Sequence, residues 1–519
     1  MLHFAASISH KALHNKQLRK TAEEIKMHRR AVIIGSGLGG LESGVILARN
    51  GYDVTVLEKH PTSAGGCLQT FARRSFSFDT GLHFVGALGE GQSLRRIFDY
   101  FGLSDLPWKQ MDKDCVDEIV IDGRSFPLAS GYDNYLNRLA EFFPGERAAL
   151  EKYVALLKDV GDNIFGAFTR DGAHPLFTQG AKAWLEENFK DPLLIRVISG
   201  AFMRTGLLTD ETPLYLFAQI NSSFVQSAWR LQGGGNQIKD RLVAQIEEAG
   251  GRVITGATVR GIESRDGKVQ GVRAQTAGGR QKEEGGDSTE DTEDAVFFPA
   301  DIVISNIHPA ITAGLCGDGL RKVYKDRLSS LQNGPGVFTA NIALKPGTIP
   351  YLNSNVFIHE SGSEDALMIH FYPPEGSDAS AAAPLAADRI DLIAPMAISL
   401  VEKWRGSAPG ARGEGYESMK AAMLEKCIAV AERRIPGLRD AIDGVWTSTP
   451  LSWEHYTGTP GGSAFGIRKD WRDSLGTLIS PRTHMEGLYL TGQNLNLHGI
   501  LGVSMTALLS CRQIPGIEI

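Results

Sequence analysis

The sequence predicts an α/β fold whose main domain is Rossmann-like and is assembled from segments that lie far apart in the chain. Three observations lead to this prediction. A buried β run near the N-terminus continues into a glycine-rich turn and a helix, a second strand and helix block begins near residue 232, and a strand, turn and helix close the chain after residue 487. With 519 residues, 42% of them hydrophobic and 22% charged, the chain is long enough for about two to four globular domains.

Residues 1–29, ahead of the first predicted strand, form a basic tail. The first thirty residues contain seven Lys or Arg side chains and two acidic ones, and they lack the apolar stretch of a secretory signal. We expect a solvated or weakly helical tail. Attachment to a membrane surface and a translation start at Met27 are the alternatives.

The composition excludes several classes of protein. A net charge of −6 gives no general attraction to nucleic acid. The five cysteines are scattered without a CxxC pair, which argues against a disulfide framework or a zinc site, and the spacing of the other His and acidic residues predicts no metal site. No apolar run approaches the ~18 residues needed to span a bilayer. We therefore expect a reducing, cytoplasmic location, with peripheral membrane contact as an additional expectation.

The first predicted β run, residues 31–34, is followed by a helix over 38–50 and a second strand over 54–57. Between the first strand and the helix, residues 35–40 fit the G-x-G-x-x-G pattern, and Glu58 ends the second strand. In this context the pattern indicates dinucleotide binding rather than a plain glycine-rich turn.

The individual residues of this motif have distinct physical roles. Gly35 allows the sharp turn, Gly37 lets a pyrophosphate approach the backbone, and Gly40 allows close packing of helix on strand. Free N–H groups at the start of the helix attract the anion. Glu58 is expected to accept hydrogen bonds from the ribose hydroxyls.

The extent of the nucleotide domain favours FAD over a nicotinamide cofactor. Gly65 and Gly66 closely follow the first unit, residues 232–262 give a second helix and strands with a hairpin at 265–267, and Gly492 follows a strand near the C-terminus. A nucleotide domain built from such distant segments suits a long, embedded flavin dinucleotide.

These elements divide the chain into interleaved domains. We predict that residues 30–115, 228–309 and 476–519 form the FAD-binding domain. An inserted α+β domain for a substrate or lipid then comprises 116–227 and 310–475. Residues 277–294, which are rich in acidic side chains, are expected to form a solvated excursion between strands.

Several longer motifs make the sequence similar to a known family. They are A-G-G-C at 64–67, F-D-T-G-L-H-F-V-G at 78–86, E-H-Y-T-G at 454–458, G-S-A-F-G at 462–466, L-T-G-Q-N at 490–494 and L-H-G-I-L-G-V at 497–503. Over about residues 30–515 the chain resembles the flavoprotein family of phytoene desaturases, carotenoid isomerases and retinol saturases. The C-terminal motifs, and Cys67 where many phytoene desaturases carry arginine, resemble the retinol saturase branch.

The resemblance implies a fold of the glutathione-reductase and amine-oxidase type and a set of residues that line FAD. Those residues are Gly35, Gly37, Gly40, Glu58, Gly65, Gly66, Val259, Gly492, Gln493, Gly502 and Val503. Val259 would contact adenine through its backbone, although a plain core position is the alternative for Val259 and Val503. Gly502 and Val503 would open the last helix, whose dipole faces the flavin.

Two histidines are candidate catalytic residues because imidazole titrates near neutral pH. His83 follows the F-D-T-G turn and His498 lies in the closing motif. A structural role, hydrogen-bonded to cofactor or backbone, is the alternative for each of them. Cys67 is expected to pack against the cofactor rather than to act as a redox thiol.

The resemblance implies a flavoenzyme that saturates, desaturates or isomerises carbon–carbon double bonds of a polyene or isoprenoid lipid, with saturation favoured. NAD(P)H or another donor would supply the electrons. The apolar stretch 193–224 is a candidate tunnel wall, with Phe202, Tyr215, Phe217 and Phe224 within it, and core packing explains these residues equally well. An amine oxidase and a non-catalytic prenyl-lipid carrier are the alternatives from other classes.

Overall fold

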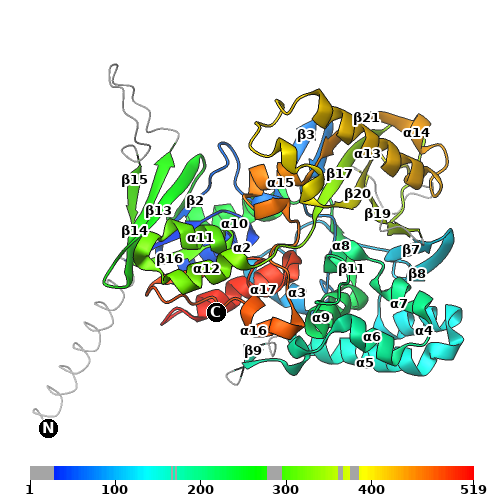
Figure 1. Cartoon of the computed structure of the whole chain (residues 1–519), viewed down its shortest axis with the longest axis horizontal. Helices are drawn as coiled ribbons and strands as arrows, with labels where there is room; N and C mark the ends of the chain where they lie inside the picture. The colour runs from blue at the N-terminus through cyan, green and yellow to red at the C-terminus, as the bar shows by residue number, and fades with distance from the viewer. Residues whose placement is uncertain (1–28, 165–167, 170–171, 277–294, 361–365, 375–384) are drawn as a thin grey trace, which may run out of the picture.

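The computed structural model describes residues 29–164, 168–169, 172–276, 295–360, 366–374 and 385–519. Its two largest sheets have different topologies and lie side by side, with a helical region below the second (Figure 1). Among these residues, no helix combines the length and the apolar character needed to cross a bilayer.

The first sheet is parallel and five-stranded, in the order β12-β2-β1-β16-β22. Its strands are β1 (Arg30–Ile34), β2 (Asp53–Leu57), β12 (Arg252–Ile254), β16 (Ile302–Ser305) and β22 (Leu488–Leu490). Strands from remote parts of the sequence therefore pair directly, which confirms the prediction of a discontinuous Rossmann-like fold.

Three helices pack together beside this sheet. α2 (Leu38–Arg49) contacts both α10 (Asn236–Glu248) and α17 (Gly499–Arg512). Apolar side chains of all three belong to one core with the inner strands, including Leu41, Ile246 and Met505. Because α2 is buried on nearly all sides, its sequence is apolar and glycine-rich rather than amphipathic.

A smaller antiparallel sheet projects from one side of the five-stranded sheet (Figure 1). It contains β13 (Ala257–Arg265), β14 (Lys268–Thr276) and β15 (Val296–Pro299). The turn between β13 and β14 confirms the predicted hairpin. The acidic stretch 277–294 lies outside the described residues.

The second large sheet has seven strands in the order β21-β17-β20-β19-β18-β7-β8. They are β7 (Asp117–Ile121), β8 (Arg124–Leu128), β17 (Gly336–Leu344), β18 (Asn355–His359), β19 (Ala366–Phe371), β20 (Arg389–Met396) and β21 (Ile442–Ser448). Its central strands are buried along almost their whole length, and most of their side chains are apolar. All seven strands fall within the ranges predicted for the inserted domain.

Helices pack against this second sheet. The long helix α13 (Glu414–Glu432) contacts β19 and β20. The helical region carries α4 (Tyr132–Phe142), α5 (Arg147–Asp162), α6 (Ala181–Asn188), α7 (Pro192–Ser199), α8 (Phe202–Thr205) and α9 (Leu214–Gln226). Its apolar side chains share a core with the sheet, to which Phe202, Tyr215 and Phe217 belong.

The remaining elements connect these parts. They are β3 (Thr70–Arg73), β4 (Phe76–Asp79), β5 (Val85–Gly86), α3 (Ser93–Phe101), β6 (Trp108–Gln110), β9 (Phe168–Thr169), β10 (Gly172–Ala173), β11 (Ala228–Leu231), α11 (Pro309–Leu315), α12 (Lys322–Ser330), α14 (Leu438–Ala441), α15 (Pro450–Thr457) and α16 (Ser474–Thr477). The sheet β5-β11-β6 brings the segment after His83 beside the strand that follows α9.

Candidate functional site

A cavity of about 490 Å³ lies where the glycine-rich turn, β17, β20, α9 and the start of α17 converge. All but one of the residues predicted to hold a cofactor line it, and so do both candidate histidines. The exception is Gly40. It packs beneath the turn, where a Cβ atom would lie 2.1 Å from the carbonyl oxygen of Gly35.

The glycines at one end of this cavity leave space that side chains would fill. Gly35, Gly65 and Gly66 have φ angles of +88°, +112° and +54°, a region that L side chains rarely adopt. A Cβ on Gly37 would lie 2.8 Å from Nδ2 of Asn306, and one on Gly66 would lie 3.3 Å from the Cα of Gly37. The backbone of these glycines lines the cavity, in the space that a ligand would occupy.

Glu58 connects the turn to the next loop. Its Oε2 accepts hydrogen bonds from the backbone N–H (3.0 Å) and the hydroxyl (2.6 Å) of Ser36, and its Oε1 accepts one from the N–H of His60 (2.8 Å). The Ser36 hydroxyl in turn accepts a hydrogen bond from the N–H of Gly65. Because a carboxylate offers about four lone-pair sites, Glu58 can still accept a hydrogen bond from a ribose hydroxyl.

The last helix begins earlier than expected. α17 starts at Gly499, with His498 in the N-cap position, so the prediction that Gly502 and Val503 open the helix is wrong. They lie one turn inside it and still line the cavity. The glycine at 499 has a φ of +75° and the chain can therefore turn into the helix at that point.

Together these residues fit a dinucleotide cofactor. Gly492, Gln493 and Val259 lie in the same cavity wall as the turn and Glu58. The side chain of Asn306, which follows β16, reaches the positions where Cβ atoms on Gly39, Gly40 and Gly492 would lie. Sequence reasoning missed Asn306, because only the pairing of β16 with β1 places it there.

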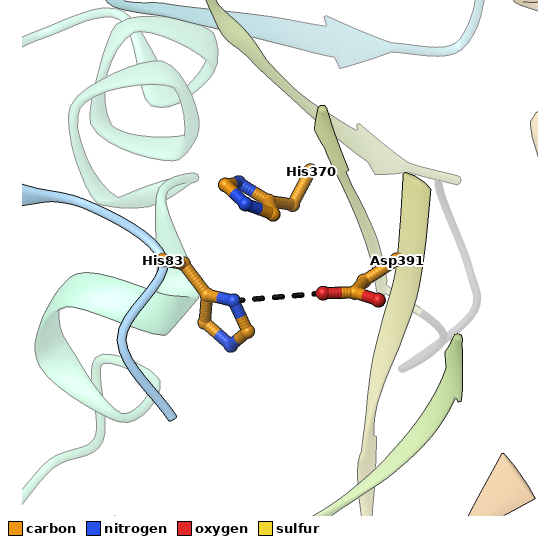
Figure 2. A group of neighbouring side chains, drawn as sticks. All are labelled: His83, His370 and Asp391. Carbon is orange, nitrogen blue, oxygen red and sulfur yellow. Dashed lines mark ion pairs between the residues drawn. The ribbon is translucent and has the colours of Figure 1, made fainter. Parts of the chain in front are cut away.

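His83 lies in the loop between β4 and β5, and its ring reaches toward the seven-stranded sheet (Figure 2). Its Nδ1 is 3.7 Å from Oδ2 of Asp391 and has no hydrogen-bond partner among the described residues. Burial, with a smaller contribution from the charge of Arg230, lowers the pKa of His83 to about 4. The side chain is therefore neutral at pH 7, and the expectation that it titrates near neutrality is not supported.

His498 makes a defined backbone contact. Its Nε2 lies 2.9 Å from the carbonyl oxygen of Arg204, which can only accept, so Nε2 carries the proton. Burial lowers the pKa of His498. The proton on Nε2 is thus already engaged, which favours a positioning role for His498.

Three comparisons with known proteins agree with this geometry. The family model of NAD(P)-binding Rossmann-like domains matches residues 33–101. All-trans-retinol 13,14-reductase of Rattus norvegicus is 28% identical over 92% of this chain and 84% of its own length. Prolycopene isomerase 1 of an Oncidium hybrid cultivar is 23% identical, over 94% and 84% respectively.

The chain is thus a homologue of retinol saturases and carotenoid isomerases. A solved structure of putrescine oxidase with putrescine bound aligns with a TM-score of 0.62 at 14% identity, covering 94% of this chain and 98% of that one. This likeness confirms the predicted amine-oxidase type of fold and, at such low identity, concerns the fold alone.

In this homologue of the retinol saturases, two further residues lie close to His83. The sequence analysis did not single them out. His370 on β19 and Asp391 on β20 are cross-strand partners, and their ligand-type atoms lie within 4.8 Å of one another and of those of His83. Such a group resembles a metal site. However, the charges of Arg230 and Arg389 act on these histidines and disfavour a further cation there.

The walls of the cavity combine aromatic and polar side chains. Phe84 and Phe224 pack with ring centroids 4.9 Å apart, and both line the cavity. The other aromatic residues of the expected tunnel wall, Phe202, Tyr215 and Phe217, lie in the core instead. Gln219, only 2% exposed, also lines the cavity, and neither atom of its amide has a hydrogen-bond partner.

Cys67 also lines the cavity. Burial raises the pKa of its thiol to about 11, so the thiolate that redox chemistry requires is not formed at neutral pH. This agrees with the expectation of a packing role.

Proposed function

We propose that the protein is an FAD-dependent oxidoreductase acting on carbon–carbon double bonds of a polyene or isoprenoid lipid, with saturation as the favoured direction. The observation that carries the proposal is a single cavity in which the glycine turn and Glu58 adjoin apolar walls and His83. The retinol 13,14-reductases and prolycopene isomerases among its relatives act on polyenes, as their names state, and support this substrate class.

The proposed cofactor site uses the chain's own backbone. Gly35, Gly37, Gly65 and Gly66 would hold the pyrophosphate, and Glu58 would accept from the ribose. Val259, Gly492, Gln493, Gly502 and Val503 would line the remainder, while Gly40 acts by packing. FAD bound there would supply hydride transfer to or from the substrate.

The protein's own residues would contribute three things to the reaction: they bind the substrate, exclude water and move one proton. Phe84 and Phe224 pack together and offer apolar surface for a conjugated chain, and the guanidinium of Arg204 lies over both rings, 4.5 Å from the centroid of Phe224. We assign His83 as the residue that moves the proton, because its ring lines the cavity and its Nδ1 is not engaged. The surrounding parts of 116–227 and 310–475 would form the substrate domain.

The proposal is tested by loading the protein with FAD, photoreducing it without oxygen, and mixing it with candidate polyenes. A gain of two hydrogens in product mass, with flavin reoxidation, signals saturation. A loss of two hydrogens from substrate by the oxidised protein signals desaturation, and unchanged mass with a shifted absorption band signals isomerisation. Absence of a flavin spectrum after reconstitution, or peroxide release with amines, would contradict the proposal.

We expect His83→Ala to keep its FAD and to lose turnover by a factor of at least about 100, the lower range for a general acid. His498→Asn, which retains a side-chain donor for the Arg204 carbonyl, serves as the matched comparison and should lose less. Flavin content by absorbance and turnover by product mass are the measurements. Normal turnover in His83→Ala would exclude it as the proton donor.

A further inference from the structure

A row of buried polar side chains crosses the seven-stranded sheet. Asn341 on β17 is the cross-strand partner of Asp391 on β20, which is the partner of His370 on β19. Nδ1 of His370 lies 3.5 Å from Oδ1 of Asn355 on β18, and Asn355 is paired with Asp117 on β7. None of the five is more than 4% exposed. Because opposite residues of neighbouring strands point to one face, the row lies on a single face of the sheet.

This face is the one that the cavity uses. Thr339 on β17 and Ile393 on β20 are cross-strand partners that line the cavity. Thr339 lies two residues before Asn341, and Ile393 lies two residues after Asp391. Side chains two apart on a strand share a face. His83 approaches the row from the cavity side, so its ring connects Asp391 with the space in which a substrate would lie (Figure 2).

Asp391 is held in place by neutral donors. Oδ1 accepts a hydrogen bond from the amide of Asn341 at 2.6 Å, and Oδ2 accepts one from the hydroxyl of Tyr372 at 2.6 Å. Burial raises the pKa of Asp391 to about 7, despite these donors. The distance of 3.7 Å would permit an ion pair with His83, but burial favours the neutral form of both groups.

We propose that Asp391 stores a proton for His83 and that the two residues deliver it together to the substrate carbon. The proposal rests on the proposed function and gives it a specific proton source. In the saturating direction, the O–H bond of Asp391 breaks as an N–H bond forms at Nδ1 of His83. In the same concerted step the proton on Nε2 leaves to form the new C–H bond, so that His83 never carries both protons; FAD held in its site would supply the accompanying hydride.

The charges balance in this sequence. His83 changes its tautomer but stays neutral, and Asp391 becomes a carboxylate that accepts from Tyr372 and Asn341. A small rotation of the His83 ring would shorten the 3.7 Å separation to a hydrogen bond, as catalytic contacts commonly tighten when substrate binds. A neutral, buried imidazole can thus move a proton without ever forming an imidazolium ion.

The other charged and titratable groups around the pair set the pH at which it works. Asp79 raises the pKa of Asp391, Arg389 lowers it, and Arg230 lowers the pKa of His83. The neighbouring Tyr372 and His370 both stay neutral, because burial raises the pKa of the first and lowers that of the second.

The first test needs no turnover. Infrared spectra of the FAD-loaded protein, taken across pH 5–9, should contain a protonated buried carboxyl band that disappears with a midpoint near pH 7 and is missing from Asp391→Asn. Burial also raises the pKa of Asp79 to about 7 and that of Glu42 to about 8, so these carboxyls contribute bands of their own. The Asp391 band is the one that is missing from Asp391→Asn and remains in the control Asp79→Asn. Identical spectra for wild type and Asp391→Asn would overturn the proposal.

A second variant covers the case in which Asp391→Asn does not fold. His83→Gln changes a side chain at the cavity and leaves the sheet intact. The frequency of the Asp391 carboxyl band should shift in this variant, because its neighbour has changed. An unshifted band would show that the two groups do not interact and would overturn the proposal.

The kinetic test separates this proposal from the proposed function. Since the delivering state requires protonated Asp391, kcat for saturation in the wild type should fall as pH rises through about 7. At pH 6, Asp391→Asn should show kcat at least about tenfold lower, with KM and flavin content unchanged and the pH step absent. A normal kcat with the pH step retained would refute the role of Asp391. Wild-type protein that turns over no polyene would instead refute the proposed function.

Discussion

Gly40 shows how one residue determines whether the dinucleotide turn can form. A Cβ at this position would meet the backbone carbonyl of Gly35 at 2.1 Å, and a backbone atom cannot rotate away as a side chain can. We expect Gly40→Ala to lower the free energy of unfolding by about 1–3 kcal/mol, the usual cost of overpacking. Its flavin content after reconstitution should fall at least about tenfold. Chemical denaturation and flavin absorbance measure the two effects.

The matched control is Gly145→Ala. A Cβ on Gly145 would have nothing within 4 Å, and its φ is not in the left-handed region. This variant should bind flavin and unfold as the wild type does. Equal flavin content in Gly40→Ala and Gly145→Ala would show that close packing of α2 on the turn is not needed for the cofactor.

At the scale of elements, a buried carboxyl joins the first and last helices of the Rossmann-like part. Glu42 on α2 accepts a hydrogen bond from the hydroxyl of Ser504 on α17 at 2.7 Å, and its other oxygen has no partner. Burial raises the pKa of Glu42 from 4.5 to about 8. The helix pair therefore packs around a neutral carboxylic acid at pH 7.

This raised pKa predicts how stability depends on pH. Because the folded state binds the proton more tightly, the stabilisation is complete below about pH 4.5 and is lost as pH rises through about 8. We expect the wild-type unfolding temperature to fall between pH 6 and 9, and Glu42→Gln, which stays uncharged, to fall less. Glu263→Gln, on the outer hairpin and paired with Arg273 at the surface, should match the wild type. Parallel curves for Glu42→Gln and wild type would contradict this account.

The elements that the sequence predicted correctly are those with local signals. The turn at 35–40, Glu58 and the β13–β14 hairpin each depend on residues within about thirty positions, where turn chemistry and hydrophobic period are informative. The start of α17 was misplaced by three residues because His498 and Gly499, not the apolar run, set its first turn.

The polar row could not be predicted in the same way. Asp117, Asn341, Asn355, His370 and Asp391 become neighbours only through the register of five strands. In the sequence, each of these five is a single polar residue in or beside an apolar run. That pattern is typical of a hydrogen-bonded residue in the hydrophobic core and does not indicate a functional site. The lowered pKa of His83 likewise follows from burial that no local pattern reveals.

At the scale of the whole molecule, the two large sheets lie side by side (Figure 1), and residues from both parts of the chain line the cavity. The five-stranded sheet contributes the glycine turn, and the seven-stranded sheet contributes Thr339, Ile393 and the polar row behind them. The site therefore depends on both parts, which alternate along the chain.

Two large side chains line the cavity and are also exposed to solvent; we refer to them as its rim. Ile311 on α11 and Tyr456 on α15 both line the cavity and are 38% and 55% exposed. Apolar side chains at such a rim can enter the interfacial region of a bilayer and let a lipid pass directly into the cavity. We propose that the molecule docks on membranes through this rim.

Flotation with liposomes in the absence of detergent tests this docking. We expect the wild type to float, and the double variant Ile311→Ser with Tyr456→Ser to float several-fold less. Phe142→Ser, at an exposed position on α4 that does not line the cavity, should behave as wild type.

Repeating the flotation at high salt distinguishes docking through the rim from docking through the basic tail. High ionic strength screens the attraction of Lys and Arg to the membrane but leaves the insertion of apolar side chains intact. Binding that vanishes at high salt and is unaffected by the double variant would assign membrane contact to residues 1–29. Recovery of the wild type only in the unbound fraction would exclude docking by either route.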